Sequence, residues 1–425
     1  MQAELISIGD ELTSGQRLDT NSQWLSQRLG ELGVAVHYHT TVADDLAANV
    51  AVFRQAISRA DVVVATGGLG PTADDLTREA LAQMVGVELV LDQASLDHIR
   101  RLFARRARPM PDSNVVQAMF PAGSRVVANP HGTAPGVDLE VPPPLGRPSR
   151  VFALPGVPAE MQEMWFETVA PRLIEWGAGG QVIRHRRVKC FGVGESDLEQ
   201  MLPDLIRRGR TPSVGITVSD ATITLRITAC GATEAACHEA MAPTIATIRD
   251  CLGTLVFGEE DDELPDVVVR LLAERRATLA TVEWGTAGLI AQWLGEAARS
   301  GDVYTAGMVV GSPAALVRLL DMSPNLVTEQ NPTSAETVKA MAQACRERAG
   351  SGYGLAVGAF PSFDPTASVP EPVHIALSTR DTVFVRSAPF AGHPAILKPR
   401  AAKQALDFVR LRLLTPTPSF VSRRS

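Results

Sequence analysis

The sequence has few cysteines, and none of them is arranged for a disulfide framework or a zinc site. Only 5 of the 425 residues are cysteines, and they are scattered without a C-x-x-C pair. An odd, scattered set of this kind is typical of buried thiols in a reducing compartment. We therefore expect structural thiols rather than metal-binding or disulfide-bonded cysteines.

An excess of basic residues and long apolar runs are absent as well. The net charge is −7 and the isoelectric point is about 5.7, which argues against a general attraction to nucleic acid or anionic membranes. No apolar run reaches membrane-spanning length, and the first residues carry no basic region or cleavage signal of a leader. These absences predict a cytoplasmic protein without membrane association and argue against a nucleic-acid partner.

Aromatic residues are scarce around the two basic clusters, at residues 184–189 and 207–210. Without aromatic side chains to stack on bases, we interpret the clusters as a solvated strand face and a helix C-terminus. Contact with nucleic acid or phosphate is the alternative. No Ser-His-Asp constellation is recognisable either, so nothing indicates a serine hydrolase of that type.

Strands that alternate with helices dominate the first 176 residues. Strands are expected at residues 3–8, 34–42, 61–65 and 87–91, and they are separated by segments with helical spacing of apolar residues. This alternation predicts an α/β fold with a parallel sheet covered by helices on both faces. At 425 residues with 45% hydrophobic content, the chain is expected to form two to four domains.

The stretch of residues 66–77, TGGLGPTADDLT, follows the buried strand expected at residues 61–65. Its glycines force a turn, and we expect a helix to begin near Thr72, Asp74 and Asp75. A strand, a glycine turn and a helix N-terminus together present backbone N–H groups to an anion. For the glycines alone, an ordinary turn with acidic cap residues is an equal alternative. The Pro-Thr and Asp-Asp pairs favour a phosphate or nucleotide site.

A second acidic loop, with Asp10 and Glu11, directly follows the first strand. Because the carboxyl ends of parallel strands meet at one edge of a sheet, this loop and the glycine loop are expected to converge. Both carboxylates, paired with those of Asp74 and Asp75, suit a hard cation such as Mg²⁺. A metal there polarises a phosphoryl group and lowers the pKa of bound water. The implied chemistry is hydrolysis or transfer at a phosphate ester or anhydride.

Further segments complete this part of the chain. Residues 111–117 are polar, with amide side chains suited to reading a base or ribose, and residues 129–136 form a second glycine-rich loop. Residues 151–160 repeat the strand–glycine–helix pattern. A proline-rich run at residues 142–148 is expected to be a surface loop, and residues 177–180 are expected to be a linker.

The remaining residues are predicted to form two more domains. Residues 181–255 indicate a small α+β unit with a tight hairpin at residues 219–221. Residues 264–414 alternate strands and helices again, which predicts a third α/β domain. The tail, residues 415–425, has too few apolar residues to pack and is expected to be frayed.

Four motifs, read together, resemble the CinA family of competence/damage-inducible proteins. They are IGDEL at residues 8–12, the stretch at residues 66–77, NPHGTAPG at residues 129–136 and LPGVP at residues 154–158. The likeness covers nearly the whole chain. It implies a MoaB/MogA-like, molybdopterin-binding-like domain at residues 1–176, a KH-like domain at residues 181–255 and a CinA C-terminal domain at residues 264–414.

The resemblance also implies functions. In the family, the first domain is associated with metal-dependent ADP-ribose pyrophosphatase activity, which gives AMP and ribose 5-phosphate. The third domain is associated with nicotinamide-mononucleotide deamidase activity. The implied cofactor is a divalent ion, Mg²⁺, Mn²⁺ or Co²⁺, with K⁺ as a further candidate, and the implied assembly is a homo-oligomer such as a dimer.

The first domain keeps the family pattern, and we assign individual roles from the expected geometry. Asp74, Asp75 and Glu11 are the predicted catalytic residues, and Asp10, Glu11 and Asp75 are the predicted metal ligands. The predicted contacts to phosphate and substrate are Gly67, Gly68, Gly70, Thr72, Asn21, Asn114, Gln117, Thr133 and Gly156.

The third domain departs from the family pattern. The family has an AESCTGG turn with a serine nucleophile, whereas residues 282–288 read VEWGTAG and place Trp284 in the position of the serine. A downstream YSNEAK segment supplies a tyrosine and a lysine, but here it reads GSPAAL from Gly311 to Leu316. Because an indole cannot attack an amide carbonyl, we expect a retained scaffold without deamidase activity.

The leading hypothesis is therefore hydrolysis of ADP-ribose, or a related nucleoside diphosphate sugar, by the N-terminal domain. One alternative is a nicotinamide-nucleotide amidase that works through substituted residues. Another is a non-enzymatic nucleotide-binding protein linked to competence or DNA damage. In each case the expected partner is a small nucleotide.

Overall fold

The computed structural model describes residues 1–141, 148–297, 301, 303–327, 334–362, 368–390 and 393–415. The chain divides into two compact units. One comprises Met1–Arg184 and Thr228–Ala240, and the other comprises His185–Ile227 and Met241–Ser425. Most of the predicted proline-rich loop and of the predicted frayed tail lies outside the described residues.

The N-terminal unit contains a six-stranded sheet with the order β2-β1-β3-β8-β7-β6. Strands β2, β1, β3 and β8 run parallel to one another, and β7 and β6 continue the sheet antiparallel. The predicted parallel sheet is thus confirmed for four strands. Their bounds are β1 (Gln2–Ile8), β2 (Ala35–Val42), β3 (Val62–Thr66), β6 (Arg125–Val127), β7 (Gly136–Val141) and β8 (Ser149–Leu154).

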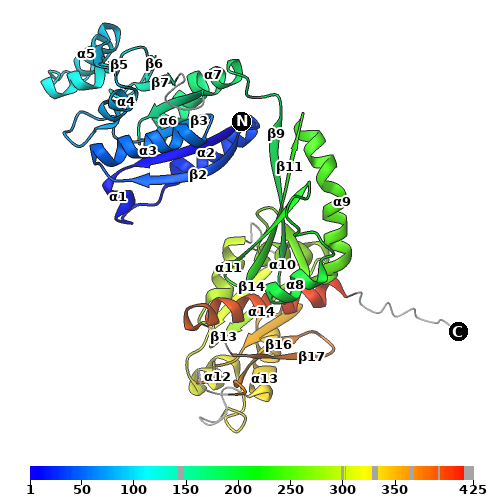
Figure 1. The fold of residues 1–425 in the computed structure, drawn as a ribbon. Coiled ribbons are helices and arrows are strands. Elements are labelled where there is room, and N and C mark those ends of the chain that lie inside the picture. Colours follow the sequence, from blue (N-terminus) through cyan, green and yellow to red (C-terminus); the bar gives the residue numbers. More distant parts are fainter. Residues whose placement is uncertain are drawn as a thin grey trace. The chain divides into compact units, whose positions relative to one another are not determined.

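Helices cover both faces of this sheet, as predicted (Figure 1). Neighbouring residues of a strand point to opposite faces. Accordingly, Ile6 packs in one cluster with Phe53, whereas Leu5 packs in the other with Leu25 and Trp165. The helices are α1 (Asp10–Thr13), α2 (Thr20–Glu31), α3 (Leu46–Arg59), α4 (Thr77–Val85), α5 (Gln93–Arg105), the 3₁₀ helix η1 (Asp112–Ala118), α6 (Pro158–Met164), the π-helical turn η2 (Trp165–Val169) and α7 (Ala170–Glu175).

Two predictions about this unit are wrong. The strand β4 (Leu89–Leu91) does not join the parallel sheet but pairs antiparallel with β5 (Met119–Pro121) in a separate two-stranded sheet. Helix α4 begins at Thr77, later than expected. The reason is local, because the Asp75 carboxylate accepts hydrogen bonds from the N–H and the hydroxyl of Thr72 and closes a turn before the helix.

The next part of the chain forms a four-stranded sheet with the order β10-β11-β9-β12. Asp220 and Ala221 have φ values of 47° and 62°, as a two-residue type I′ turn requires, so the predicted hairpin is confirmed. Strand β12 follows residue 255 and pairs with β9. The elements are β9 (Val182–Cys190), α8 (Glu195–Met201), β10 (Ser213–Ser219), β11 (Thr222–Gly231), α9 (Glu234–Leu252), the 3₁₀ turn η3 (Gly253–Leu255) and β12 (Val256–Glu259).

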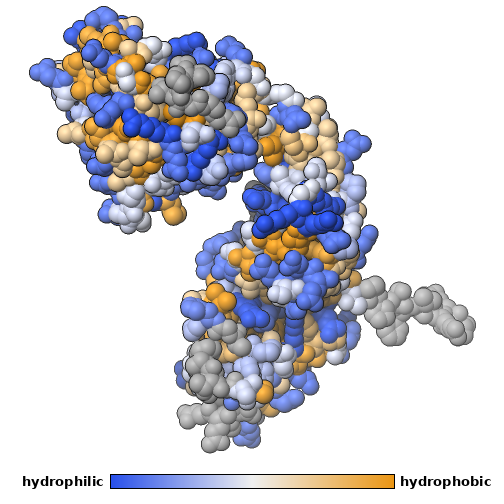
Figure 2. All heavy atoms as spheres, viewed as in Figure 1, coloured by the Kyte–Doolittle hydropathy of each residue, from blue (hydrophilic) through white to orange (hydrophobic). Residues whose placement is uncertain are grey.

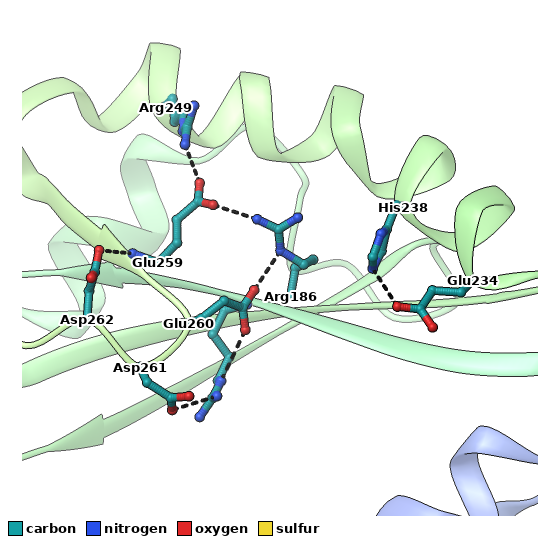
Figure 3. A network of polar contacts seen from close by, with 9 residues as sticks. Arg186, Glu234, His238, Arg249, Glu259, Glu260, Asp261 and Asp262 are labelled. Atoms are coloured by element: carbon teal, nitrogen blue, oxygen red, sulfur yellow. Dashed lines mark hydrogen bonds and ion pairs between the residues drawn. The ribbon is translucent and has the colours of Figure 1, made fainter.

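Acidic residues at and after the end of β12 pair with the basic cluster of β9 (Figure 3). The guanidinium of Arg186 lies 2.6 Å from carboxylate oxygens of both Glu259 and Glu260. Arg187 pairs with Asp261 at 2.9 Å. Because these cations are held in ion pairs, less positive charge is left to attract phosphate groups.

The last part of the chain forms a five-stranded sheet with the order β14-β13-β15-β16-β17. Strands β14, β13 and β15 are parallel, and β16 and β17 are antiparallel. Its elements are α10 (Leu264–Glu274), β13 (Leu279–Glu283), α11 (Leu289–Ala297), β14 (Tyr304–Val309), α12 (Pro313–Leu320), α13 (Ala335–Ala349), β15 (Tyr353–Val357), β16 (Pro372–Ser378), β17 (Val383–Pro389) and α14 (Pro394–Leu414). Among the described residues, no helix is both long enough and apolar enough to span a membrane.

The visible surface mixes hydrophilic and hydrophobic residues in each unit (Figure 2). In the N-terminal unit, Leu18 is 85% exposed, Phe166 is 55% exposed and Val157 is 52% exposed. Single exposed apolar residues are common on protein surfaces. Leu18 and Val157 differ from Phe166 in that both of them line one cavity.

Candidate functional site

A cavity of about 520 Å³ lies at the carboxyl edge of the N-terminal sheet. Its walls come from the loops that follow β1, β3 and β8, including Glu11, Gly68 and Gly156. The predicted convergence of the first acidic loop with the glycine loop is therefore confirmed. In α/β sheets this edge is where ligands usually bind.

The glycine loop after β3 is held by Thr77, the first residue of α4. The Thr77 hydroxyl donates to the carbonyl of Gly67 at 2.9 Å, and the Thr77 N–H donates to the carbonyl of Gly68 at 3.1 Å. Gly67 and Gly68 have φ values of 103° and 63°, which favour glycine. A Cβ on Gly67 would overlap the carbonyl oxygen of Ile8, and one on Gly68 would overlap the Thr77 hydroxyl. Both positions therefore require glycine.

The next carbonyl of the loop, that of Leu69, accepts hydrogen bonds from two buried side chains. Arg78 donates to it at 3.0 Å, and the carboxamide of Gln117 donates to it at 3.2 Å. A trans peptide points its N–H opposite to its C=O. The N–H of Gly70 therefore points away from Arg78 and Gln117, and the N–H groups of Gly68 and Leu69 point away from Thr77, which donates to the carbonyls of Gly67 and Gly68. Within the described residues, none of these three N–H groups donates a hydrogen bond.

The three free N–H groups belong to residues that line the cavity. Successive backbone N–H groups that share one side of a loop form an anion-binding nest, as in phosphate sites. The loop geometry thus supports the predicted phosphate-binding role. The donors come from the loop itself, because α4 begins only at Thr77.

A second glycine-containing loop, between β6 and β7, contributes Thr133 and Ala134 to the same cavity. Asn129 gives this loop its shape. Its carboxamide donates to the carbonyl of Ala134 at 3.0 Å and to the carboxylate of Glu160 at 2.7 Å, and it accepts from the N–H of Gly132 at 2.8 Å. These contacts hold the backbone next to Thr133 in place.

Arg78 connects the two loops. It is only 2% exposed and donates to the carbonyls of Leu69 and Pro135, each at 3.0 Å. Its Nε atom has no hydrogen-bond partner. Burial lowers the pKa of Arg78 to about 10, so the side chain is still charged near neutral pH.

Asp10 and Asp44 form a reciprocal pair after the ends of β1 and β2. The N–H of Asp10 donates to the Asp44 carboxylate at 2.9 Å, and the N–H of Asp44 donates to the Asp10 carboxylate at 3.2 Å. Burial and the negative charges of Asp10, Asp74 and Glu11 raise the pKa of Asp44, and they outweigh the hydrogen bond from Asp10. These carboxylates are therefore close enough to repel one another, and their negative field suits a cation.

Thr72 restrains the acidic pair that follows the glycine loop. Its N–H donates to the Asp75 carboxylate at 2.9 Å, and its hydroxyl donates to the same oxygen. A hydrogen bond from Thr72 also lowers the pKa of Asp74, which is exposed. Asp74 is consequently ionised near neutral pH.

The predicted metal ligands Asp10, Glu11 and Asp75 do not form a ready-made metal centre. Within the described residues, no three Asp, Glu, His or Cys side chains are grouped closely enough to hold an ion. Mg²⁺ in proteins is usually held by one or two carboxylates together with substrate phosphates. The carboxylates around Asp44 have the right chemistry for that type of site, in which the ligand completes the coordination.

The predicted site residues fall into two groups. Asp10 and Asn114 do not line the cavity. Asn114 is 5% exposed and donates to the carboxamide of Gln117 at 2.8 Å, so it orients Gln117 instead. The predicted site residues that do line the cavity are Glu11, Asn21, Gly67, Gly68, Gly70, Thr72, Asp74, Asp75, Gln117, Thr133 and Gly156.

Several residues of this site were not predicted from the sequence. Asp44 follows β2 at the same sheet edge, so the rule that located Asp10 could also have located Asp44. Arg17 adds a basic side chain to the lining, and Leu18 and Val157 add apolar ones. Their approach to the cavity depends on loop paths for which the sequence offers no periodic signal.

Two of the three predicted lost deamidase positions of the third domain have packing roles. Trp284 and Leu316 belong to one hydrophobic cluster, in which Leu316 is fully buried, while Gly311 is exposed before α12. The neighbouring Glu283 carboxylate accepts hydrogen bonds from the N–H groups of Ile290 and Ala291 at 3.0 and 2.7 Å. Glu283 thereby caps the start of α11.

The fold is an α/β domain with a cavity at the carboxyl edge of its sheet, followed by two further domains. Residues 4–175 match the family described as "Probable molybdopterin binding domain". Residues 185–258 match the "Damage-inducible protein CinA KH domain", and residues 261–413 match the "CinA C-terminal domain". The predicted domain types and their order are thus confirmed.

The chain belongs to the CinA family. It is 36% identical over 409 residues to a "Putative competence-damage inducible protein" of Moorella thermoacetica, an alignment that covers 96% of this chain and 97% of the relative. A protein with the same description from Symbiobacterium thermophilum is 38% identical over 373 residues, covering 87% and 86% of the two chains. A solved structure of CinA from Thermoplasma acidophilum shares 32% identity with a TM-score of 0.37, covering 40% of this chain and 98% of that one.

Proposed function

We propose that the N-terminal domain hydrolyses ADP-ribose, or a related nucleoside diphosphate sugar, to AMP and ribose 5-phosphate with the help of a divalent metal ion. The observation that carries this proposal is that the free N–H groups of Gly68, Leu69 and Gly70 share one cavity with the carboxylates of Glu11 and Asp44. A nest beside carboxylates suits a phosphate anhydride and a hard cation. The volume, about 520 Å³, is in the usual range for small-molecule sites.

In this proposal the residues of the cavity have separate tasks. The nest binds one phosphate of the diphosphate, and Arg17 offers a positive charge to the other. Leu18 and Val157 offer apolar surface to the base. The predicted ligands Asp10, Glu11 and Asp75 would hold Mg²⁺, Mn²⁺ or Co²⁺, which would supply Lewis-acid stabilisation of the developing charge.

The reaction adds one water molecule across the anhydride. The water oxygen bonds to one phosphorus, the bridging P–O bond breaks, and the bridging oxygen leaves on the other phosphate. One proton of the water passes to a carboxylate base and then to solvent. Asp44 suits this task, because its raised pKa makes it a better base than an ordinary aspartate.

The direct test is AMP release from ADP-ribose by the purified protein with Mg²⁺, Mn²⁺ or Co²⁺, followed by chromatography. We expect metal-dependent release of AMP and ribose 5-phosphate. Asp75→Ala is expected to reduce the rate at least about tenfold, because it frees Thr72 and removes a cavity carboxylate. Asp97→Ala, an exposed aspartate on α5, is the matched control. No AMP from the wild type, or equal rates for the wild type and Asp75→Ala, would refute the proposal.

A second candidate function, nucleotide binding without turnover, is favoured by one observation. The described residues contain no preassembled group of three metal-ligating side chains. Calorimetric binding of ADP-ribose with no AMP formed under any of the three metals would establish this function instead. We expect no ammonia from nicotinamide mononucleotide, because Trp284 and Leu316 are part of a hydrophobic cluster.

A further inference from the structure

Arg78 is a buried cation on which Glu79 and Asp75 act electrostatically without forming an ion pair with it. It is 2% exposed, and within the described residues no carboxylate forms an ion pair with it. The other two buried arginines among the described residues have such partners, since Arg150 binds Asp138 at 2.8 Å and Arg410 binds Asp407 at 2.7 Å. A buried charge without an ion pair is costly, so phosphate charge in the cavity would add to the stabilisation that Glu79 and Asp75 give Arg78.

The contacts of Arg78 lead directly to the cavity. Its guanidinium donates to the carbonyl of Leu69, and the same peptide unit carries the N–H of Gly70 on its opposite side. Gly70 lines the cavity, and its N–H is one of the three free donors. A cation on the carbonyl side of a peptide polarises that peptide and makes its N–H a stronger donor.

The second hydrogen bond of Arg78 goes to the other loop of the cavity. It donates to the carbonyl of Pro135, which directly follows the lining residue Ala134. One planar side chain therefore fixes the spacing of two loops that line the same cavity. An ammonium group in place of the guanidinium could not span both carbonyls with the same fork geometry.

We propose that Arg78 is a positioning residue for phosphate binding, which aims the N–H of Gly70 at the ligand and takes the diphosphate of a nucleotide as its counter-ion. Arg78 does not line the cavity. It acts through the Leu69–Gly70 peptide and through its charge. The inference rests on the proposed function only in placing a diphosphate in this cavity, and it does not require hydrolysis.

The test compares ADP with adenosine, which shares the base and ribose but lacks the phosphates. Binding of both to the full chain is measured by calorimetry in the presence of Mg²⁺ for the wild type, Arg78→Met and Arg78→Lys. Arg54→Met is the matched control, because it removes the same charge from an exposed position of α3 outside the cavity.

We expect Arg78→Met to weaken ADP binding about tenfold or more and to change adenosine binding less than about twofold, since hydrogen bonds to charged groups are worth more than neutral ones. Arg78→Lys keeps the charge and is expected to lose about threefold for ADP only. Arg54→Met is expected to behave like the wild type. If Arg78→Met does not fold, Arg78→Lys provides the test, and a loss of affinity for ADP without a loss for adenosine in that variant would support the positioning role of Arg78.

Three results would overturn the inference. The first is an equal loss of affinity for ADP and adenosine in Arg78→Met, which would mean that Arg78 only holds the two loops together. The second is an unchanged ADP affinity in Arg78→Met. The third is a wild type that does not bind ADP. A failure of the proposed hydrolase function can be distinguished from a failure of this inference. Arg78-dependent ADP binding without AMP release from ADP-ribose would leave this inference standing and remove the hydrolase.

Discussion

Replacing Gly67 by alanine tests the architecture of the phosphate loop most directly. Gly67 has a φ of 103°, and a Cβ there would overlap the carbonyl oxygen of Ile8 in β1. The unfavourable φ costs about 1–2 kcal/mol for a non-glycine residue, and overpacking against a backbone atom costs a further 1–3 kcal/mol or so. We therefore expect Gly67→Ala to lower the free energy of unfolding by about 2–5 kcal/mol in total.

Gly123→Ala is the matched control for the backbone term. Gly123 also has a positive φ, 86°, but a Cβ there would meet no atom within 4 Å. Its expected cost is the backbone strain alone, about 1–2 kcal/mol. Urea denaturation gives both free energies of unfolding, and calorimetry gives the ADP affinity of the folded variants. Equal destabilisation by the two substitutions would show that Gly67 is not in close contact with β1.

Two further predictions concern charged residues of the cavity. Arg17→Ala is expected to weaken ADP binding, measured by calorimetry, about 3–10-fold. Its free energy of unfolding is expected to stay within about 0.5 kcal/mol of the wild-type value, because exposed charges contribute little to stability. An unchanged ADP affinity would show that Arg17 is not part of the site. Asp44→Asn is expected to stabilise the apo protein at pH 7. The raised pKa of Asp44 means that its ionised form opposes folding, so the gain is lost as the pH falls through the folded-state pKa toward 3.8, the ordinary value. A gain in urea stability that does not shrink in acid would contradict this cause.

The sheet and its functional edge could be predicted from the sequence because their signals are local. Strands β1 and β3 are short apolar runs, and the loops with Asp10 and Gly67 follow these two runs. Parallel strands bring their carboxyl ends together in any register, so the convergence of the two loops needed no knowledge of side-chain packing. Asp44 follows β2 in the same way and was within reach of the same reasoning.

Other parts of the site could not be predicted because they depend on contacts between distant residues. In the sequence, Arg78 is simply a basic residue within a helix, which usually indicates a solvated face. Its burial depends on the position of Pro135, 57 residues away, whose carbonyl it reaches. The late start of α4 was missed for a different reason. Asp75 can cap a helix or close a turn with Thr72, and only the structure shows that it closes the turn.

Opposite charges at and beside the cavity would be balanced together by one ligand. Arg78 makes no ion pair within the described residues, although the charges of Glu79 and Asp75 act on it. Burial and the negative charges of Asp10, Asp74 and Glu11 raise the pKa of Asp44. A divalent cation alone would relieve only the carboxylates, and a diphosphate alone would relieve only the arginine.

Mg²⁺ and ADP are therefore expected to raise the melting temperature together by more than the sum of their separate effects. Each ligand is expected to strengthen the binding of the other by the same factor, because coupling between two sites is reciprocal. Thermal denaturation with Mg²⁺, with ADP and with both measures this coupling, and adenosine in place of ADP is the control without phosphates. Strictly additive shifts would mean that the acidic residues and the phosphate loop bind independently, and that the cavity does not hold a metal–diphosphate complex.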